Sequence, residues 1–439
     1  MLKLRFKRPP VDPGVQPVVA PPGGGRLAWE EAGAALVGRL ESVVAAVVGA
    51  EGVAPRDVAA FAAGMVLRAW RFAGFRAAGG EAGLERVTLV VDDPAACRLA
   101  WEAALPAVRG CLFARDLVAE PANHLTTRAF AKRLEGLAEF GIHVDVWGRK
   151  RLARAGFGGL LAVGGGSEHP PRLAVLRWRG SFDAPPVVFV GKGLVFDTGG
   201  ISIKPARGME AMRADMAGAA ACAGAMLALA LRHSPAPAVA VLAIAENATG
   251  AGSYRPGDVL RMASGRTVEV VDTDAEGRLV LADALHHAVT RYRPRAVVDL
   301  ATLTGAIVTA LGHHRAGLFG RDAALLSALA AAGEEVGERL WPMPIGEGHR
   351  ADLRSDIADL RQCMPAGTGR QPDASHAAAF LESFVGEAPW AHLDIAGVET
   401  QAKPHALGPA GATGFGARLL DRLVAAQYEE PPEPPGGRP

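Results

Sequence analysis

Val271-Asp272-Thr273-Asp274-Ala275-Glu276-Gly277-Arg278-Leu279 is the stretch around which this sequence is organised. It follows a β-rich run at 267–270 and precedes a predicted helix at 280–285. If the stretch is extended, Asp274, Glu276 and Arg278 share one face, because side chains two apart on a strand do so. Two carboxylates are costly to bury unless something pairs with them, and a divalent cation with oxygen ligands would do so. A solvated acidic turn is the alternative, and only further ligands elsewhere in the chain can exclude it.

Composition indicates an ordinary soluble globular protein. The chain has 439 residues, of which 49% are hydrophobic and 21% are charged. Its formal net charge of +1 gives no sign of a polyanionic partner. The first 25 residues lack a continuous apolar run, so no secretory signal is predicted. The longest apolar run, 217–231, is shorter than the roughly 20 residues of a membrane-spanning helix, and we expect a buried helix there instead.

The four cysteines, at positions 97, 111, 222 and 363, are too scattered for a disulfide framework or a C-x-x-C pair. Their spacing favours a reducing cytoplasm and makes a thiolate zinc site improbable. The twelve histidines form no H-E-x-x-H motif. Any metal must therefore rest on carboxylates or on an unusual ligand.

Strands and helices alternate through most of the chain, which predicts an α/β fold with a mixed, mostly parallel sheet flanked by helices. We expect a flexible Pro/Gly-rich start at 1–25, a small α/β domain at 26–98, a catalytic domain at 99–428 and a disordered tail at 429–439. Helices are predicted at 29–50 and 57–75 in the small domain. The strands predicted for the larger domain are 143–146, 173–178, 187–190, 238–243, 267–270, 296–300 and 392–395, and its helices include 127–140, 216–232, 279–292, 375–385 and 418–426.

More candidate ligands follow the buried strand 187–190. Lys192 and Asp197 come at its carboxyl end, where open α/β sheets bind ligands. A phosphate loop is excluded, because that motif requires Gly at 186 and Ser or Thr at 193, where this chain has Pro and Gly. Lys204 and Asp215 come next along the chain. Taken singly, Asp215 could be a helix cap and Lys192 a surface lysine.

Together these residues carry a resemblance to the leucyl aminopeptidases, which are cytosolic peptidases with two metal ions. The resemblance covers roughly residues 110–425. The matching motifs are Val190-Gly191-Lys192-Gly193, Phe196-Asp197-Thr198-Gly199-Gly200, Ile203-Lys204, Met212-Arg213-Ala214-Asp215-Met216, Arg255-Pro256-Gly257-Asp258, Thr273-Asp274-Ala275-Glu276-Gly277-Arg278-Leu279, Asp299-Leu300-Ala301-Thr302-Leu303-Thr304-Gly305, Trp390-Ala391-His392-Leu393-Asp394-Ile395-Ala396-Gly397 and Gly411-Ala412-Thr413-Gly414.

The resemblance implies two divalent ions per chain, Zn²⁺ or Mn²⁺. One ion would use Lys192, Asp197, Asp215 and Glu276, and the other would use Asp197, Asp274 and Glu276. In such two-metal hydrolases the ions acidify a bridging water and polarise the scissile carbonyl. The resemblance further implies peptide substrates with a free N-terminus and a homo-hexamer.

The same resemblance assigns two catalytic residues and a substrate pocket. Lys204 would stabilise the oxyanion, and Arg278 would hold a bicarbonate that relays a proton. The pocket for the first residue of the peptide would be lined by Met212, Thr302, Leu303, Gly305 and Glu399.

The chain departs from the family pattern at several positions. Asp272 stands where the family usually has Asn, Ala119 replaces another Asn, and the segment 369–376 is less glycine-rich and less apolar than usual. The N-terminal region is also shorter. Glu399 stands where a small or apolar residue is usual, so a pocket selective for Lys or Arg is one reading. A carboxylate turned to solvent or to Lys403 is the other.

Two alternative functions remain open from the sequence. One is a narrow dipeptidase of the Cys-Gly type, and the other is a DNA-binding architectural role. The near-zero net charge and the lack of a long basic run argue against nucleic acid.

Overall fold

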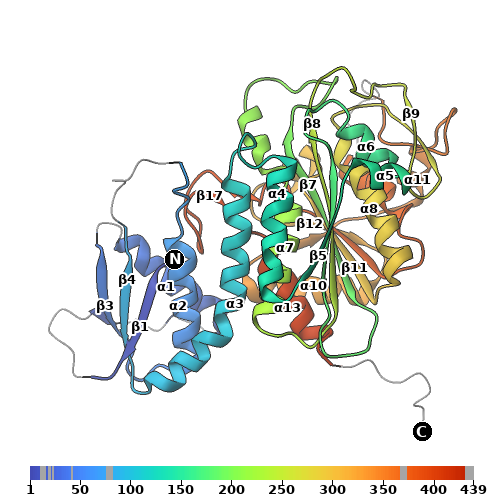
Figure 1. The fold of residues 1–439 in the computed structure, drawn as a ribbon. Helices are drawn as coiled ribbons and strands as arrows, with labels where there is room; N and C mark the ends of the chain where they lie inside the picture. Colours follow the sequence, from blue (N-terminus) through green and yellow to red (C-terminus); the bar gives the residue numbers. More distant parts are fainter. Residues whose placement is uncertain are drawn as a thin grey trace, which may run out of the picture.

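The computed structural model describes residues 1–9, 16–17, 21, 24–40, 43–75, 83–365 and 373–430. A small N-terminal domain lies beside a larger α/β domain, and helix α3 (Pro94–Ala119) passes from the first into the second (Figure 1). The side chain of Asp93 caps this helix by accepting hydrogen bonds from the backbone N–H groups of Ala95 and Ala96. Because α3 is continuous over 26 residues, it runs across the domain boundary predicted at 98/99.

The small domain is a parallel sheet in the order β1-β4-β3-β2, packed on two helices. Its first strand corrects the flexible start predicted for 1–25 at residues 3–7, which pair with β4 along their whole length, whereas positions 10–15, 18–20 and 22–23 lie outside the described residues. The helix predicted at 29–50 is also wrong in its second half, which is strand β3. β-Branched Val47 and Val48 favour a strand there. The elements are β1 (Lys3–Lys7), β2 (Gln16–Pro17), α1 (Arg26–Arg39), β3 (Ala45–Gly49), α2 (Pro55–Ala69) and β4 (Arg86–Val90).

The larger domain is built on an eight-stranded sheet in the order β13-β12-β15-β11-β7-β8-β6-β5. Its centre, β15-β11-β7-β8, is parallel, whereas β12 is antiparallel to β15 and β6 is antiparallel to β8. The mixed, mostly parallel sheet predicted from the sequence is therefore confirmed. The strands are β5 (His143–Trp147), β6 (Arg172–Trp178), β7 (Val187–Asp197), β8 (Ala238–Asn247), β11 (Ala296–Ala301), β12 (Ala316–Gly320), β13 (Leu340–Pro342) and β15 (Trp390–Asp394).

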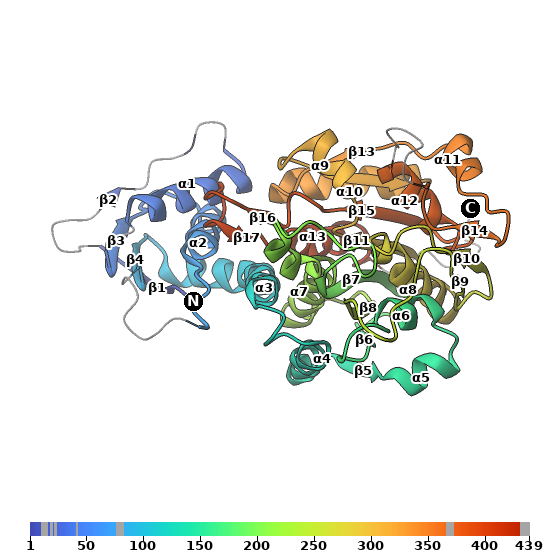
Figure 2. The same cartoon turned by 90° about the horizontal axis from the view of Figure 1, so that it is seen from above.

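Helices cover both faces of this sheet, as the two views show (Figures 1 and 2). One apolar core lies between the sheet and a group of helices that includes the Ala-rich α7, and a second core lies on the opposite face. The first group is α4 (Thr127–Glu135), α7 (Ala217–Leu231), α10 (Ala323–Val336) and α13 (Ala417–Gln427), and the second is α5 (Arg149–Arg154), α6 (Gly158–Val163), α8 (Glu276–Tyr292) and α12 (Asp373–Glu382).

Helix α7 lies within the one described segment that is long and apolar enough to cross a membrane, Met209–Leu231. Since its most apolar stretch is 94% buried inside the protein, the segment has the character of a core helix. Alanine side chains allow α7 to pack closely between the sheet and α3.

The strand predicted at 267–270 does not belong to the large sheet. The run 267–270 forms β10 (Thr267–Glu269), which belongs to a separate three-stranded sheet with β9 (Val259–Arg261) and β14 (Leu360–Arg361). Strands β12 and β13 were not predicted from the sequence. The remaining elements are η1 (Gly136–Phe140), η2 (Met209–Ala214), α9 (Gly305–Leu311), α11 (Glu347–Asp352), β16 (Thr400–Gln401) and β17 (Gly411–Ala412).

Candidate metal centre

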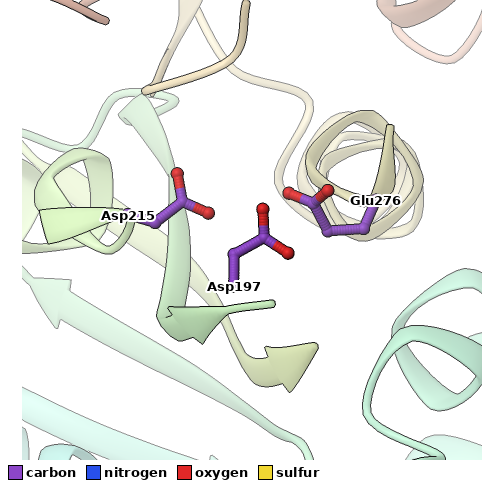
Figure 3. Close-up of side chains that lie close together, drawn as sticks. All are labelled: Asp197, Asp215 and Glu276. Carbon is purple, nitrogen blue, oxygen red and sulfur yellow. The ribbon is translucent and has the colours of Figure 1, made fainter. Parts of the chain in front are cut away.

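Three buried carboxylates meet at the carboxyl end of the central strand (Figure 3). Asp197 ends β7, Asp215 lies between η2 and α7, and Glu276 is the first residue of α8. One oxygen of each lies within 4.8 Å of one oxygen of the others. All three residues are at most 6% exposed. The fold thus gathers three acids from sequence positions up to 79 residues apart.

The loop after β7 holds Asp197 in place. Gly199 and Gly200 turn the chain through positive φ values of 86° and 69°, which glycine adopts without steric cost. The Asp197 Oδ1 atom accepts hydrogen bonds from the Gly199 N–H at 2.9 Å and from the Asn247 side-chain amide at 2.8 Å. Asn247 ends β8, beside β7. The sequence analysis missed this residue, although its place at a strand end was a usable signal.

Lys192 lies among the same carboxylates. Its Nζ atom is 2.9 Å from Asp215 Oδ1 and 2.8 Å from Glu276 Oε1, and it donates to the Thr302 carbonyl at 2.8 Å. A Cβ atom at Gly277 would lie 2.7 Å from this Nζ atom. Glycine at 277 therefore leaves the space that the Lys192 side chain occupies. This contact explains why the stretch 271–279 has a glycine at that position.

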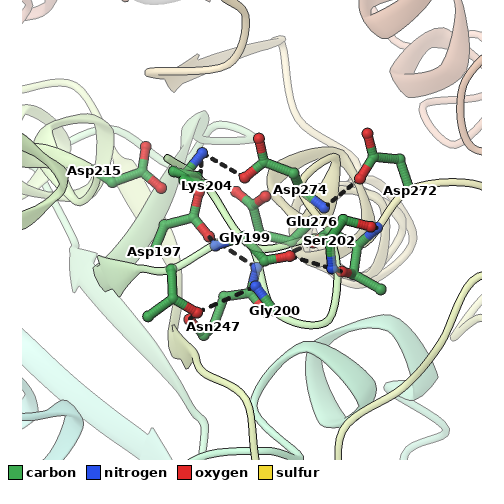
Figure 4. Close-up of polar contacts among 12 residues, drawn as sticks. Asp197, Gly199, Gly200, Ser202, Lys204, Asp215, Asn247, Asp272, Asp274 and Glu276 are labelled. Carbon is green, nitrogen blue, oxygen red and sulfur yellow. Dashed lines mark hydrogen bonds and ion pairs between the residues drawn. The ribbon is translucent and has the colours of Figure 1, made fainter. Parts of the chain in front are cut away.

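Lys204 links Asp274, the remaining candidate ligand, to the three buried carboxylates (Figure 4). Its Nζ atom lies 2.8 Å from Asp197 Oδ2 and also pairs with Asp274. The Asp274 side chain is 35% exposed and lies outside the group of three buried carboxylates. The structure therefore places the candidate ligands in a buried inner group and one outer, partly exposed acid.

The charges of this cluster are poorly balanced. Burial raises the pKa of Asp215 and of Glu276, and the nearby Asp197 carboxylate raises both further. Burial also raises the pKa of Asp274. Burial opposes the charged form of Lys192, but the carboxylates of Asp215 and Glu276 outweigh it and raise the pKa of this lysine. The acids repel one another in a medium that solvates them badly, so additional positive charge would stabilise them.

Two oxygens of the inner group have no hydrogen-bond partner among the described residues. They are Asp215 Oδ2 and Glu276 Oε2, both buried. Buried polar atoms are nearly always satisfied in folded proteins, so orphaned carboxylate oxygens call for an explanation. Unpaired carboxylate oxygens are suitable ligands for divalent cations, and the residues present therefore fit a metal ion.

Hydrogen bonds hold the loop that carries Asp274. The Thr273 hydroxyl donates to the Gly199 carbonyl at 2.6 Å and accepts from the Ser202 N–H at 2.8 Å, which ties this loop to the loop after β7. Asp272 accepts the N–H of Asp274 at 2.9 Å. The unusual acid at 272 thus shapes the turn, a role that the sequence did not indicate.

Gln362 holds the same loop from a distant part of the chain. Its Oε1 atom accepts the N–H groups of Val271 at 2.7 Å and Asp272 at 3.1 Å, and its Nε2 atom donates to the Ala275 carbonyl at 3.0 Å. The residue is fully buried. No motif marks Gln362 in the sequence, so sequence reasoning missed it.

The extended geometry assumed for 274–278 is wrong. Residues 272–275 form a turn, and α8 begins at Glu276, so the two-residue alternation of a strand does not apply. Arg278 donates to the Gln362 carbonyl at 2.9 Å and to Asp373 Oδ1 at 2.8 Å. Asp373 belongs to the unusual segment 369–376, of which residues 369–372 lie outside the described part of the chain.

The predicted pocket residues Met212, Thr302, Leu303 and Gly305 lie in or next to elements that surround the buried carboxylates. Met212 lies in η2, three residues before Asp215. The Thr302 hydroxyl donates to Asp215 Oδ1 at 2.6 Å, and the side chain of Leu303 lies beside Gly277. Gly305 begins α9 and faces open space. These contacts put Thr302 and Leu303 next to the inner group.

Glu399 follows β15 and is partly buried. Its Oε2 atom is buried without a hydrogen-bond partner in the described residues, and burial raises its pKa. The other oxygen accepts from the Thr400 hydroxyl at 3.2 Å. This carboxylate is therefore not simply turned to solvent.

Comparison with known proteins identifies the family. Residues 112–421 match the family described as "Cytosol aminopeptidase family, catalytic domain". The chain belongs to the cytosol aminopeptidase family. A probable cytosol aminopeptidase of Brucella ovis is 45% identical over 383 residues, which cover 86% of this chain and 76% of that protein. One of Gluconobacter oxydans is 45% identical over 418 residues, covering 93% and 84%.

Solved structures agree with the family assignment. The bottromycin maturation enzyme BotP in complex with Mn has a TM-score of 0.84 and 37% identity, covering 93% of this chain and 89% of that one. A second structure of BotP gives a TM-score of 0.83 with 38% identity. As a member of the cytosol aminopeptidase family, the chain is an aminopeptidase, a metal-binding hydrolase that acts on peptide bonds. The matches support neither the narrow dipeptidase nor the DNA-binding alternative.

Proposed function

We propose that this aminopeptidase removes the first residue of peptides with the help of two divalent metal ions held by the buried acids. The observation that carries the proposal is the convergence of Asp197, Asp215 and Glu276 beside two lysines, with two carboxylate oxygens that find no partner in the described part of the chain. Structural acids in a core are normally paired or hydrogen-bonded on every buried oxygen. A cluster that is incomplete without additional cations fits a metal site better than a purely structural role.

One ion would be held by Lys192, Asp197, Asp215 and Glu276, and the other by Asp197, Asp274 and Glu276. Lys192 must lose its proton to act as a ligand, and an adjacent dication favours the neutral amine. The partial exposure of Asp274 would leave the second ion accessible to a substrate from solvent.

The chemistry that bound divalent ions supply is acidification of water and polarisation of a carbonyl oxygen. The chain's own residues orient and complete that site. Lys204 would stabilise negative charge that develops on the scissile carbonyl, and its ion pairs with Asp197 and Asp274 support this role. Thr302 orients Asp215 through its hydroxyl. A pocket lined by Met212 and Leu303 would receive the first side chain of the peptide.

The identity of the metal and the assembly are finer parts of this proposal. We assign Zn²⁺ or Mn²⁺, and the manganese complex of BotP is the comparison that favours the second. A homo-hexamer and a cytoplasmic location rest on the resemblance to the family, and four buried free cysteines suit a reducing compartment. Whether Arg278 holds the bicarbonate expected from the resemblance depends on the ion pair between that arginine and Asp373.

Metal content and hydrolysis of a panel of aminoacyl chromogenic substrates test the proposal together. The wild type should hold two ions per chain and release the chromophore. Asp274→Ala should lower metal content and abolish turnover. Asp258→Ala is the matched control, because the partners of that side chain among the described residues are the backbone N–H and the guanidinium of Arg255. Full activity of Asp274→Ala, or a metal-free and active wild type, would refute the assignment.

Light scattering tests the assembly separately. A hexamer has six times the 45.5 kDa mass of the chain. A monomer mass at micromolar concentration would exclude the hexamer and leave the metal assignment untouched.

A further inference from the structure

Arg278 is a buried cation, and two of the five N–H groups of its guanidinium have partners among the described residues. It lies in the first turn of α8 and is 2% exposed. One terminal nitrogen donates to the Gln362 carbonyl at 2.9 Å, and the other donates to Asp373 Oδ1 at 2.8 Å. The Nε atom is buried and has no partner in the described part of the chain. A buried guanidinium requires a counter-charge, so the identity of its anion matters for the site.

Asp373 supplies that counter-charge from a distant segment. It is the first residue of α12, and its side chain is 40% exposed. Among the described residues it is the one carboxylate within ion-pair distance of Arg278. Hydrogen bonds between charged partners are about twice as strong as neutral ones. The pair therefore locks the arginine against α12 at the edge of the metal centre.

A dissolved bicarbonate would have to compete for the same arginine. One terminal nitrogen already binds a backbone carbonyl, the other binds Asp373, and Nε is closed off from solvent. A small planar anion binds a guanidinium through two N–H groups at once, and beside Asp373 it would bring a second negative charge to an arginine whose charge is already neutralised. A tethered carboxylate competes at a high effective concentration, on the order of millimolar or more, without loss of translational freedom. The arrangement does not suit a bound bicarbonate.

We propose that Asp373 is the built-in anion of Arg278 and takes the place that a bicarbonate would otherwise fill. Asp373 acts through the arginine, so it is a positioning residue of the metal centre. The inference rests on the proposed function for its kinetic consequence, whereas its binding consequence is independent of catalysis. This aminopeptidase therefore works without added bicarbonate.

The competing explanation is purely structural. An acid in the first turn of a helix stabilises the positive end of the helix dipole, and Asp373 has that position in α12. Such a role predicts that replacing Asp373 lowers stability. It predicts no new response to bicarbonate, which separates the two explanations.

Anion binding is measured first, on the metal-free protein. Thermal unfolding of wild type, Asp373→Ala and Asp373→Asn is followed in buffer depleted of carbon dioxide, with bicarbonate or chloride added at equal pH and ionic strength. A ligand that binds only the native state raises the unfolding midpoint. We expect bicarbonate to raise the midpoint of both variants and leave the wild type unchanged. Asp373→Asn keeps the shape and an acceptor oxygen, which preserves the test if the alanine variant folds poorly.

Chemical rescue is the second readout. In bicarbonate-free buffer the two Asp373 variants should lose about 10- to 100-fold in kcat, as expected for removal of a supporting contact. Added bicarbonate should restore part of the loss, whereas wild-type kcat should change less than about twofold. Asp352→Ala is the control, because Asp352 contacts α12 through His376 and not through Arg278.

Three results would overturn the inference: a wild type that binds bicarbonate, a wild type that needs it for activity, or Asp373 variants that do not respond to it in either measurement. A wild type with no peptidase activity at all would refute the proposed function instead. The unfolding experiment would still decide whether Asp373 blocks the anion site.

Discussion

Replacing Gln362 by alanine tests how the loop of the metal centre is held. The Gln362 side chain is fully buried and makes three hydrogen bonds to the backbone of residues 271, 272 and 275. This loop carries Asp274 and leads into Glu276. The backbone carbonyl of residue 362, which accepts from Arg278, is retained in the variant. The substitution thus removes the clamp on the loop and no candidate ligand.

The expected magnitude follows from these three bonds. A hydrogen bond contributes about 1 kcal/mol net to stability, and a buried group left without a partner costs about 1–3 kcal/mol. Val271 and Asp272 are only partly buried, so water can replace some of the lost bonds. We therefore expect Gln362→Ala to lower the free energy of unfolding of the metal-free protein by about 3 kcal/mol. Loss of an outer-shell partner should also weaken metal binding by about 10- to 100-fold.

Chemical denaturation of the metal-free protein measures the first effect, and competition with a chelating dye measures the second. Gln401→Ala is the control, since that side chain donates an exposed hydrogen bond to the His313 carbonyl and has no other hydrogen-bond partner among residues 1–9, 16–17, 21, 24–40, 43–75, 83–365 and 373–430. It should change stability by less than about 0.5 kcal/mol and leave metal affinity unaltered. If Gln362→Ala lost the predicted stability but kept metal affinity within about threefold, the loop would not position the ligands. An unchanged free energy of unfolding would show that the three hydrogen bonds of Gln362 do not stabilise the protein.

Three further perturbations probe the catalytic group, the pocket and the pH response. Lys204→Ala should reduce kcat by about 10²–10³ with metal content retained, and an increase in KM alone would contradict an oxyanion contact. Glu399→Ala should lower the ratio of kcat/KM for Arg over Leu substrates, because the buried carboxylate could pair with a basic side chain; an unchanged ratio would remove Glu399 from the pocket. Burial lowers the pKa of His287 and of His405 to about 4, so the unfolded chain, with an ordinary histidine pKa near 6.5, binds more protons between those values. Stability should therefore fall as pH drops from about 6.5 to 4, by up to about 1.4 kcal/mol per pH unit for each histidine. His405→Asn should flatten that slope, and an identical slope in denaturation curves would show that this histidine does not contribute.

Local sequence patterns were sufficient to predict the main elements of the larger domain. Continuous apolar runs such as 187–190 and 238–243 lie in β7 and β8, and the Ala-rich run 217–231 is α7. A strand buried on both faces is apolar throughout, so its pattern is visible without knowledge of its neighbours. The acids at the ends of such strands could likewise be identified as candidate ligands, because the carboxyl ends of parallel strands gather at one edge.

Other features depend on packing between distant segments. The run 267–270 is a strand, but a local pattern does not say which sheet a strand joins, and β10 pairs with β9 and β14. Whether Glu276 is extended or helical was also undecided locally, because the start of a helix depends on the contacts of its first turn. Tertiary contacts at this site include the burial of Lys192 against Gly277.

The residues that support the site, Gln362 and Asp373, could not be predicted from the sequence. Gln362 meets the loop at 271–275 from about 90 residues away, and Asp373 reaches Arg278 across 95 residues. Glutamine and aspartate are common in loops and at helix starts, so neither is conspicuous by type or spacing. The sequence determined which residues can bind metal, because that depends on their chemistry. Only the tertiary structure decided which side chains hold them and which anion faces the arginine, because those contacts arise when separate segments pack together.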